Sequence, residues 1–364
     1  MPQALLKSKL RALGQEAVDQ GLASALAVGV TGRHWPAPED FTLYLGHLDQ
    51  KRQQQLGATS LFDLASLTKP LATSLAILAL VSQGKVTLTS PLAQLLPQSQ
   101  IPSDKAEINL AQLLRHASGL PPHRPFYLEV AKLAQERRQE AMVERVLAEP
   151  LLAQPGQQET YSDLGFVLLG EIVRQLSGQR LDLFCRETIY RPLGLAEEII
   201  FLPRDKGHKE FVATEDCPWR GRLLAGEVHD QNCWAVGGVS GQAGLFARLA
   251  AVLKLCRFLL AAKQGQASHP NLDQQLLQRA MTPQNGPHSW GLGFDQAAAT
   301  NSAAGNRISA DNCGHLGFTG TSFWLDFQRE VAVVLLCNRI HPSTENDLIR
   351  AWRPRLHDAI FSLL

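Results

Sequence analysis

The sequence predicts an α+β fold: one antiparallel sheet built from both chain ends, helices at the two termini flanking it, and a mostly helical region inserted between. Two observations support this fold class. Residues 1–50 show the order helix, strand, strand, and residues 310–364 show the order strand, strand, helix. The middle of the chain, about 70–280, repeats its apolar residues mainly at helical spacing. Because elements pack in layers around a shared core, the strands from the two ends are expected to meet in one sheet.

The elements at the N-terminal end follow from two kinds of apolar pattern. Apolar residues recur three and four positions apart over 5–22, which predicts an amphipathic opening helix. The run 25–31 (ALAVGVT) is almost continuously apolar, and the segment 40–49 (DFTLYLGHLD) alternates apolar with polar residues. Both patterns are typical of strands.

The remaining elements are assigned in the same way. Helical spacing predicts helices over 70–83, 164–176 and 250–263. Apolar and β-branched runs predict strands over 321–327 and 330–338, and an amphipathic segment over 344–364 predicts the closing helix.

Two polar segments, 122–158 and 264–288, are rich in glutamine and irregular in pattern, so we assign them to insertions or mobile loops. The predicted organisation is a single domain over 1–364. Its α/β part covers about 1–75 and 285–364, and its inserted helical part covers about 76–284. A cleft between two such parts is a natural place for a binding site.

Composition and charge narrow the function classes. The chain has 364 residues and a net charge of +1, with 45% hydrophobic and 19% charged residues. Nucleic acid is not an expected partner, because such binding leaves a concentrated basic patch and the sequence has none. No stretch of about 20 consecutive apolar residues is present, so no membrane-spanning helix is expected.

The N-terminal region and the cysteines bear on the cellular compartment. The apolar segment 22–30 follows about twenty residues of both charge signs, unlike the short basic leader of a signal peptide. The six cysteines form no C-x-x-C pair and no dense framework. Free thiols are typical of a reducing compartment, so we expect a cytoplasmic protein.

One segment places a serine and a lysine at catalytic spacing. The segment 66–69 (SLTK) directly precedes an apolar helical run, so Ser66 stands at a helix start and Lys69 lies one turn further on the same face. The pattern alone is weak, because the segment 82–85 (SQGK) repeats it. That second serine stands at the end of the helix, where Gly84 predicts the stop.

Ser66 needs a base to act as a nucleophile, because a serine hydroxyl is weakly nucleophilic at neutral pH. Lys69 can serve if burial and the helix N-terminus favour its neutral form. The preceding residues 62–65 (FDLA) are apolar enough for such burial. The alternative is that Ser66 only caps the helix and Lys69 is solvated.

Two further features favour a catalytic site. Tyr161 stands directly before the predicted helix 164–176, where its phenolate would pair with Lys69 and exchange a proton with Ser66. The alternative for Tyr161 is a core or capping residue. The segment 314–322 (GHLGFTGTS) contains glycines that let backbone N–H groups approach a ligand closely. The N–H groups of Ser66 and Phe318 are therefore the predicted oxyanion hole.

Taken in this order, these features resemble one family of serine hydrolases: the class C β-lactamases, the low-molecular-weight penicillin-binding proteins and the β-lactamase-like esterases. The resembling segments are 61–73 (LFDLASLTKPLAT), 113–121 (LLRHASGLP), 161–171 (YSDLGFVLLGE), 226–247 (GEVHDQNCWAVGGVSGQAGLFA), 290–294 (WGLGF) and 314–326 (GHLGFTGTSFWLD). The segments VHD and GQAGLF look most similar to a bacterial subgroup that includes penicillin-binding-protein-like proteins and enzymes of muropeptide recycling.

The resemblance implies a β-lactamase/transpeptidase-like fold and a specific site. Ser66 would be the acylated nucleophile, and Lys69 and Tyr161 would be the general bases, with the division of labour between them open. The backbone N–H groups of Ser66 and Phe318 would form the oxyanion hole.

Three positions depart from the pattern of the family's β-lactamases. Asp163 stands where they usually have Asn, and His315-Leu316-Gly317 stands where they usually have Lys-Thr-Gly. Leu316 has no hydroxyl and His315 is only partly charged at neutral pH, so both weaken the binding of a substrate carboxylate. An ionised Asp163 repels a carboxylate and suits an N–H, a hydroxyl or a cation. Asp163, His315 and Gly317 are the predicted substrate-binding residues.

The expected function is hydrolysis of an ester or amide, with a small molecule, short peptide or muropeptide as substrate and with no cofactor or metal. A true β-lactamase or D-alanyl-D-alanine carboxypeptidase is one alternative. A non-catalytic ligand-binding protein on the same fold is another.

Other polar residues in the resembling segments are expected to have structural roles. His116 is expected to be a buried turn histidine that bonds backbone carbonyls. A buried network that braces the cleft wall is expected from Arg222, Glu227, His229 and Asp230.

Overall fold

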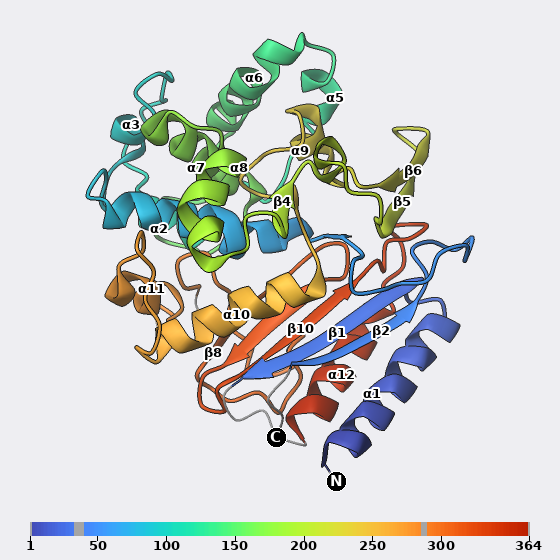
Figure 1. The fold of residues 1–364 in the computed structure, drawn as a ribbon. Helices are drawn as coiled ribbons and strands as arrows, with labels where there is room; N and C mark the ends of the chain where they lie inside the picture. The colour runs from blue at the N-terminus through green and yellow to red at the C-terminus, as the bar shows by residue number, and fades with distance from the viewer. Residues whose placement is uncertain (1, 33–39, 285–289, 363–364) are drawn as a thin grey trace.

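The structure, a computed structural model, describes residues 2–32, 40–284 and 290–362. Its central feature is a five-stranded antiparallel sheet with the strand order β2-β1-β10-β9-β8 (Figure 1). Because β1 pairs directly with β10, the two chain ends form one sheet, and the predicted α+β fold class is confirmed. The strands are β1 (Ala25–Gly32), β2 (Phe41–Gly46), β8 (Asn312–Leu316), β9 (Ser322–Asp326) and β10 (Val331–Cys337).

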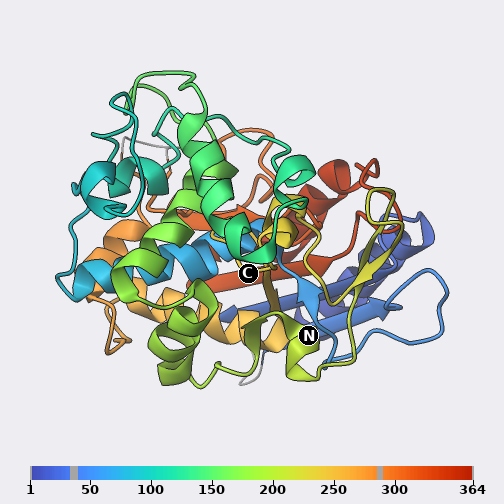
Figure 2. The ribbon, with the colours of Figure 1, turned by 90° about the horizontal axis from the view of Figure 1, so that it is seen from above.

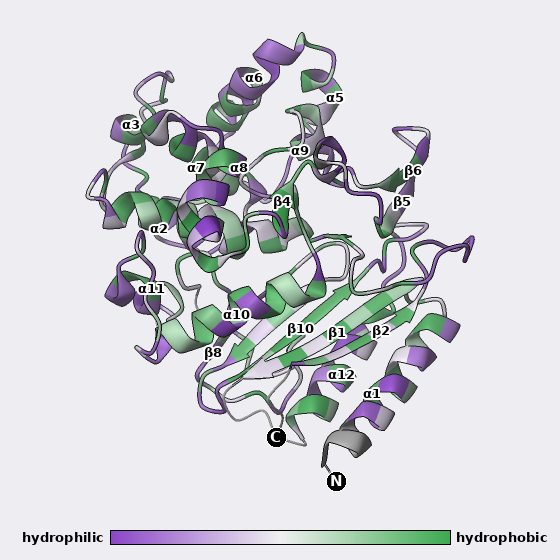
Figure 3. Cartoon of the chain, in the orientation of Figure 1, coloured by the Kyte–Doolittle hydropathy of each residue, from purple (hydrophilic) through white to green (hydrophobic). Residues whose placement is uncertain are grey.

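Helices cover both faces of this sheet. α1 (Pro2–Asp19) and α12 (Ile349–Phe361) lie side by side on one face, and α10 (Leu249–Lys263) lies on the other (Figure 1). The predicted apolar positions before Lys7 lie outside the described side chains. The strands are predominantly hydrophobic, whereas α1 carries hydrophilic residues along much of its surface (Figure 3). The sheet is therefore an inner layer between the terminal helices and the rest of the chain.

Side chains along β1 alternate between two hydrophobic clusters. Leu26 and Val28 belong to the cluster that includes α1 and α12, whereas Ala27 belongs to the larger cluster on the α10 side. Gly29 also faces α10, because a Cβ placed there would lie 2.6 Å from Leu253 Cδ1. Only glycine permits this close approach of helix and strand. Burial on both faces explains why the strand is almost continuously apolar rather than alternating.

The middle of the chain is mainly helical, and in the view from above its helices lie in front of the main sheet (Figure 2). α10 belongs to this stretch by sequence but covers the sheet. Three short strands form a second sheet and two others form a hairpin. The remaining helices are α2 (Leu75–Ser82), α3 (Leu92–Leu95), α4 (Leu110–Leu114), α5 (Tyr127–Val130), α6 (Gln135–Ala148), α7 (Asp163–Ser177), α8 (Leu181–Cys185), α9 (Gln231–Ala235) and α11 (Gln274–Ala280). The short strands are β3 (Phe62–Asp63), β4 (Ile199–Phe201), β5 (Ala213–Cys217), β6 (Arg222–Ala225) and β7 (Leu245–Ala247).

The two segments assigned to loops contain regular structure. The segment 122–158 holds α5 and the 14-residue α6, which buries Met142 and Val146. The second segment, 264–288, contains α11. The structure describes this segment as far as residue 284, and its last four residues lie outside the described part. The assignment to mobile loops is therefore wrong for these helices. The segment was assigned to a loop because it is rich in polar residues. Glutamate, arginine and glutamine are nevertheless good helix formers, and they make up much of α6.

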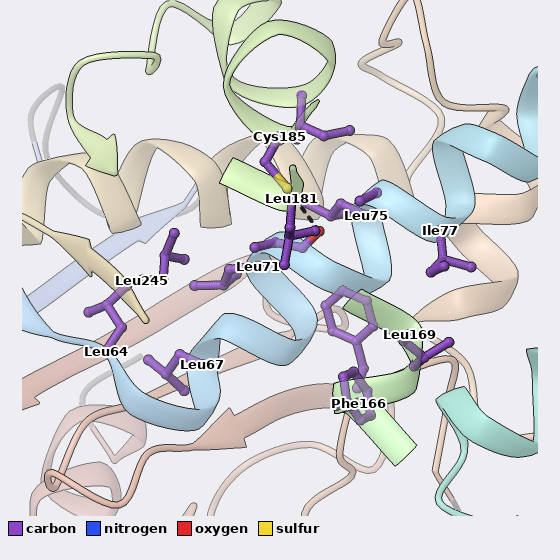
Figure 4. Packing of buried hydrophobic residues seen from close by; sticks show 14 of the residues in the cluster. Leu64, Leu67, Leu71, Leu75, Ile77, Phe166, Leu169, Leu181, Cys185 and Leu245 are labelled. Atoms are coloured by element: carbon purple, nitrogen blue, oxygen red, sulfur yellow. Dashed lines mark hydrogen bonds between the residues drawn. The ribbon is translucent and has the colours of Figure 1, made fainter. Parts of the chain in front are cut away.

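The segment that carries the predicted nucleophile runs through the centre of the helical part. A 3₁₀ turn (Ala65–Leu67) leads into a π-helical segment (Lys69–Ser74) and then into α2. Leu71 and Leu75 pack in the main core together with Phe166 (Figure 4). The window Ala65–Ser82 is long and apolar enough to cross a membrane, yet 83% of it is buried within the protein. Core packing accounts for its hydrophobicity.

Candidate active site

Ser66 lies on a tightly held turn. The residue before it, Ala65, has a φ of +48°, a conformation that non-glycine residues rarely adopt. The Asp63 carboxylate accepts hydrogen bonds from the backbone N–H of Ala65 at 2.8 Å and from that of His229 at 2.7 Å. Strained backbone of this kind persists only where surrounding contacts maintain it, and it clusters at functional sites. Asp63 therefore joins the turn of the serine to the wall of the cleft.

Lys69 contacts the serine directly. Its Nζ lies 3.1 Å from Ser66 Oγ, 2.7 Å from Asp163 Oδ1 and 3.1 Å from the backbone oxygen of Gln242. The lysine side chain is fully buried. Ser82, in the competing segment, instead donates to a backbone carbonyl of its own helix. The structure thus brings Ser66 and Lys69 together and gives the ammonium three oxygen acceptors.

The charge of Lys69 differs from the expected one. Burial is the largest influence and by itself lowers the pKa of Lys69, but the Asp163 carboxylate and Tyr161 outweigh it and raise that pKa above its ordinary value. Burial likewise raises the pKa of Asp163, but Lys69 and His123 outweigh it and lower that pKa to about 2. The resting site therefore holds an ammonium–carboxylate pair, so the neutral form of Lys69, on which its role as a base depends, is not the resting form.

Tyr161 completes the contacts around the serine. Lys69 Nζ lies 5.0 Å from the centre of its ring, and Tyr161 lines the same cavity as Ser66. Burial is the main cause that raises the pKa of the phenol, so Tyr161 is uncharged at rest. The residue directly precedes α7, whose first turn is capped by Ser162 accepting from Gly165 N–H at 3.2 Å. The structure thus brings the three predicted catalytic residues together, and their catalytic roles stay predictions.

Asp163 is the first residue of α7, where the helix dipole favours a carboxylate. Its Oδ1 binds Lys69, and its Oδ2 lies 3.7 Å from Nδ1 of His123, a side chain that is 44% exposed. Asp163 is therefore the counter-ion of Lys69 in this structure. Its predicted contact with substrate stays a prediction.

The glycine-rich segment lies against the turn of the serine. Thr319 Oγ1 donates to the backbone oxygen of Asp63 at 2.9 Å, and Thr321 Oγ1 donates to that of Leu64 at 3.2 Å. A Cβ on Gly317 would lie 2.8 Å from the same Leu64 oxygen. Glycine therefore allows the two segments to touch.

Phe318 lines the same cavity as Ser66, and its role in the oxyanion hole stays a prediction. Its backbone N–H has no acceptor among the residues that the structure describes. Its exposed ring stacks on the ring of His229 at 5.6 Å, and the guanidinium of Arg339 lies 4.7 Å from its centre. These contacts hold the turn beside Ser66, which supports a pair of N–H donors from Ser66 and Phe318.

His315 is buried behind this turn and is uncharged. Its Nδ1 donates to the backbone oxygen of Leu316 at 2.7 Å, and its Nε2 has no partner in the described part of the chain. Burial, followed by the charge of Lys69, lowers the pKa of His315 to about 3. The expected partial charge at neutral pH is therefore wrong. A neutral ring, 6.0 Å from the ring of Tyr161, offers no positive charge to a substrate carboxylate.

The rings of His116 and Trp290 pack against the ring of Tyr161. His116 is buried as expected, but its Nδ1 accepts from the backbone N–H of Ser162 at 3.0 Å rather than donating to a carbonyl. Its ring lies 4.6 Å from Tyr161 and 4.5 Å from Trp290. Sequence reasoning missed Trp290 as a residue of the site. The signal available was its place at the start of the resembling segment 290–294.

The polar network behind the cleft differs from the predicted one in one member. His229 Nε2 bonds Glu215 Oε2 at 3.1 Å, and Glu227 pairs with Arg222 at 2.8 Å. Arg222 is more than half exposed, whereas the side chain of Arg220 is 2% exposed and donates to the backbone oxygens of residues 228 and 229. Arg220 is therefore the arginine that braces this wall.

The site opens into a cavity of about 630 Å³. Ser66, Tyr161, Asp163, Gly317 and Phe318 line it, whereas the buried His315 does not. This volume suits a small molecule or a short peptide. Across the described ranges, no group of three or more His, Cys, Asp or Glu side chains is placed to hold a metal ion.

Comparisons with known proteins identify the family of the chain. A family model described as Beta-lactamase matches residues 11–355. The N-acetylmuramyl-L-alanine amidase of Bacillus subtilis (strain 168) is 32% identical over 316 residues, which cover 80% of this chain and 70% of that protein. A putative D-alanyl-D-alanine carboxypeptidase of Escherichia coli (strain K12) is 32% identical over 314 residues, which cover 79% and 72%.

Solved structures share the fold at lower sequence identity. EstCE1, described as a hydrolase with promiscuous acyltransferase activity, matches with a TM-score of 0.76 at 20% identity over 98% of each chain. The D-alanine carboxypeptidase AmpC from Burkholderia cenocepacia matches with a TM-score of 0.74 at 16% identity over 100% of each chain. The extent of the family match and the identity to curated relatives lead to one conclusion. The chain belongs to the β-lactamase family of serine hydrolases.

Proposed function

We propose that the chain hydrolyses an ester or amide bond through an acyl-Ser66 intermediate. One observation carries this proposal: Ser66 Oγ lies 3.1 Å from Lys69 Nζ, and the ring of Tyr161 lies 5.0 Å from the same nitrogen. A serine in hydrogen-bond contact with a proton acceptor, which is in turn oriented by a third group, is the arrangement of an activated nucleophile. Asp163 is that third group, at 2.7 Å from the lysine.

The protonation states at rest suggest how acylation proceeds. Lys69 passes a proton to Asp163 Oδ1 as it takes the proton of Ser66 Oγ, so the pair gains one proton and becomes an ammonium and a carboxylic acid. The serine oxygen forms a bond to the substrate carbonyl carbon, and the negative charge on the carbonyl oxygen faces the N–H groups of Ser66 and Phe318. The leaving group then departs with the proton of Tyr161, which regains one from Lys69, and Asp163 returns its proton to Lys69.

Deacylation repeats these steps with water in place of the serine. Water loses a proton through Tyr161 and Lys69, its oxygen bonds the acyl carbon, and Ser66 Oγ leaves with a proton. The products are an acid and the restored serine. Each proton that enters the Lys69–Asp163 pair leaves it again within one turnover.

We place the natural substrate among amides or short peptides derived from the bacterial cell wall. Two curated relatives support this class, because one is named as a muramyl-alanine amidase and another as a putative D-alanyl-D-alanine carboxypeptidase. A cytoplasmic location is part of the same proposal, and immunodetection of the protein in separated cell fractions tests it.

Active-site labelling tests the proposed nucleophile. A fluorophosphonate probe should label the wild-type protein but not Ser66→Ala, whereas Ser82→Ala, the matched control from the competing segment, should label normally. Absence of labelling in folded wild-type protein would instead favour a ligand-binding protein that has lost catalysis. A screen of simple esters, D-amino-acid amides, muropeptides and a chromogenic cephalosporin, with Ser66→Ala as blank, then identifies the bond that is cleaved.

A D-alanyl-D-alanine carboxypeptidase or a true β-lactamase is the second candidate, favoured by the name of the Escherichia coli relative. The neutral His315, the hydroxyl-free Leu316 and the ionised Asp163 oppose it, because none of them attracts a carboxylate next to the serine. If charge repulsion excludes penicillins, Asp163→Asn should have a higher ratio of penicillin acylation to neutral-ester acylation than wild type. An equal ratio would remove this objection.

A further inference from the structure

Each oxygen of the Asp163 carboxylate faces a different basic side chain. Oδ1 lies 2.7 Å from Lys69 Nζ, and Oδ2 lies 3.7 Å from His123 Nδ1. The two neighbours differ in their access to solvent, because the Lys69 side chain is fully buried and the His123 side chain is 44% exposed. Asp163 therefore connects a buried charge, which contacts Ser66, with a titratable group that solvent reaches.

His123 is the solvent-accessible histidine among those that the structure describes around the nucleophile. It lines the cavity into which Ser66 opens. His229, the other histidine of the cavity wall, is buried, and its Nε2 is bonded to a glutamate at 3.1 Å. His116 and His315 are buried as well, and burial is the main cause that lowers the pKa of each. The charge of His123 can therefore follow the pH of the solution.

Two carboxylates and one arginine act on the charge of His123. Asp163, at the start of α7, is the main cause that raises the pKa of His123 above its ordinary value, and Asp230, before α9, adds to this effect. Partial burial and Arg124 act in the opposite direction without reversing it. His123 therefore gains its proton at a higher pH than a free imidazole does. The other charged or titratable residues that line the cavity are Tyr161, His229, Arg339, Asp347, Arg350 and Arg353.

The charge of His123 changes the basicity of Asp163. In the proposed acylation step, Asp163 takes a proton from Lys69 as the lysine takes one from Ser66. Burial raises the pKa of Asp163, but Lys69 and then His123 outweigh it and lower that pKa to about 2. A charged imidazole beside Oδ2 stabilises the carboxylate and so opposes its protonation, whereas a neutral imidazole supplies no such charge. Loss of the charge on His123 therefore makes Asp163 a better proton acceptor.

We propose that His123 is a positioning residue that acts through Asp163, because its charge controls how readily that carboxylate accepts a proton during acylation. The inference rests on the proposed acyl-Ser66 chemistry and adds a titratable group to it. Acylation is slow while His123 is charged, and it becomes faster as the pH rises through the titration of this imidazole. The proton of Ser66 follows the path given above, and none of it passes through His123.

Two substitutions fix the charge of this side chain in opposite senses. His123→Gln leaves a neutral N–H donor at every pH, and His123→Arg leaves a permanent cation. The measured quantity is kcat/KM for 4-nitrophenyl acetate, a neutral ester, from about pH 5 to about pH 9, because this parameter reports titrations of the free enzyme. Rates with Ser66→Ala are subtracted as background.

The ratios of variant to wild type should change with pH in opposite ways. His123→Gln should be about five- to tenfold faster than wild type at the acid end of the range and equal to it at the alkaline end. His123→Arg should equal wild type at the acid end and be about five- to tenfold slower at the alkaline end. These factors are set near one pKa unit because the imidazole is partly exposed to solvent.

Substitutions at a second histidine provide the matched control. His47→Gln and His47→Arg make the same chemical changes at a residue that lines a separate cavity, so their ratios to wild type should stay constant over the range. A merely structural role of His123 would change kcat/KM in its two variants by factors that do not depend on pH. Constant ratios for His123→Gln and His123→Arg therefore overturn the proposal.

Titration of the His123 ring by NMR tests the coupling without catalysis. The ring signal that is missing from His123→Gln identifies the residue, and its pKa is compared between wild type and Asp163→Asn. Because a coupling between two sites is reciprocal, removal of the carboxylate should lower the pKa of His123 by about one unit. An unchanged pKa overturns the inference even if Ser66 cleaves the ester. If wild type cleaves no ester, the proposed function fails, whereas a lowered pKa still supports the coupling.

Discussion

Replacement of Asp163 by asparagine is the sharpest test of the charge state inferred for Lys69. The change removes the carboxylate that lies 2.7 Å from the buried lysine Nζ and leaves a side chain of nearly the same size. An opposite charge at this range shifts a pKa by ~1–3 units, and the short contact argues for the upper end. A shift of ~3 units corresponds to about 4 kcal/mol in favour of the ammonium form. Without it, burial dominates, and the pKa of Lys69 should fall below its ordinary value.

This shift has a signature in the pH dependence of acylation. At pH 7, Asp163→Asn should acylate about 10- to 100-fold more slowly than wild type, because the lysine has lost the group that takes its proton. Between about pH 7 and pH 10 the variant should recover, because Lys69 itself becomes a neutral base. In wild type, Lys69 stays charged over this range and contributes no such rise.

Stopped-flow measurement of the 4-nitrophenolate burst from pH 6 to pH 10 records the acylation step directly. Asp230→Asn is the matched control, because Asp230 lines the same cavity but bonds the first turn of α9 rather than Lys69. If the profiles of Asp163→Asn and wild type had the same shape, Asp163 would not set the charge of Lys69. The proton path through the pair would then be refuted.

Three further predictions concern the catalytic residues, the turn that carries Ser66, and a buried histidine on α12. Lys69→Ala and Tyr161→Phe should each lower ester turnover by about 10²-fold or more, and near wild-type rates in both would refute their roles as bases. Asp63→Asn should lower both kcat/KM, by about tenfold, and the unfolding temperature. The reason is that an amide offers one oxygen acceptor where two backbone N–H groups now bind a carboxylate. An unchanged kcat/KM with a lower unfolding temperature would limit Asp63 to a structural role. Burial lowers the pKa of His357 to about 3. Below about pH 6.5 the unfolded chain therefore binds a proton that the folded chain does not, and the free energy of unfolding decreases as the pH is lowered. Urea unfolding should show that His357→Gln loses about 2 kcal/mol less than wild type between pH 7 and pH 5, and an equal loss would contradict this.

The fold was predictable because its main signals are local and repeated. The apolar run at 25–31 and the helical spacing at 250–263 each identify an element without reference to the rest of the chain. They also match the strand β1 and the helix α10 within about a residue. The helix α6 was missed because glutamate, glutamine and arginine occur in both helices and loops. Only a few buried apolar positions mark this segment as a helix.

The chemistry of the site was only partly predictable. The pattern of Ser66 and Lys69 indicated their contact, because residues three apart on a helix share a face. The charge of Lys69 depends on Asp163, which lies 94 positions away in sequence and approaches it only in the fold.

The pairing of β1 with β10 has a consequence for how the protein is made. Residues 26–32 pair with residues 331–337, so β1 is synthesised well before the strand beside which it lies. Contacts this distant in sequence form slowly, because a long loop must close before they can. The turn that supplies the Phe318 N–H lies just before β9 and also arrives late. A chain synthesised only as far as β8 therefore lacks the segment that lies against the turn of Ser66, and the two segments meet only after that segment has been made.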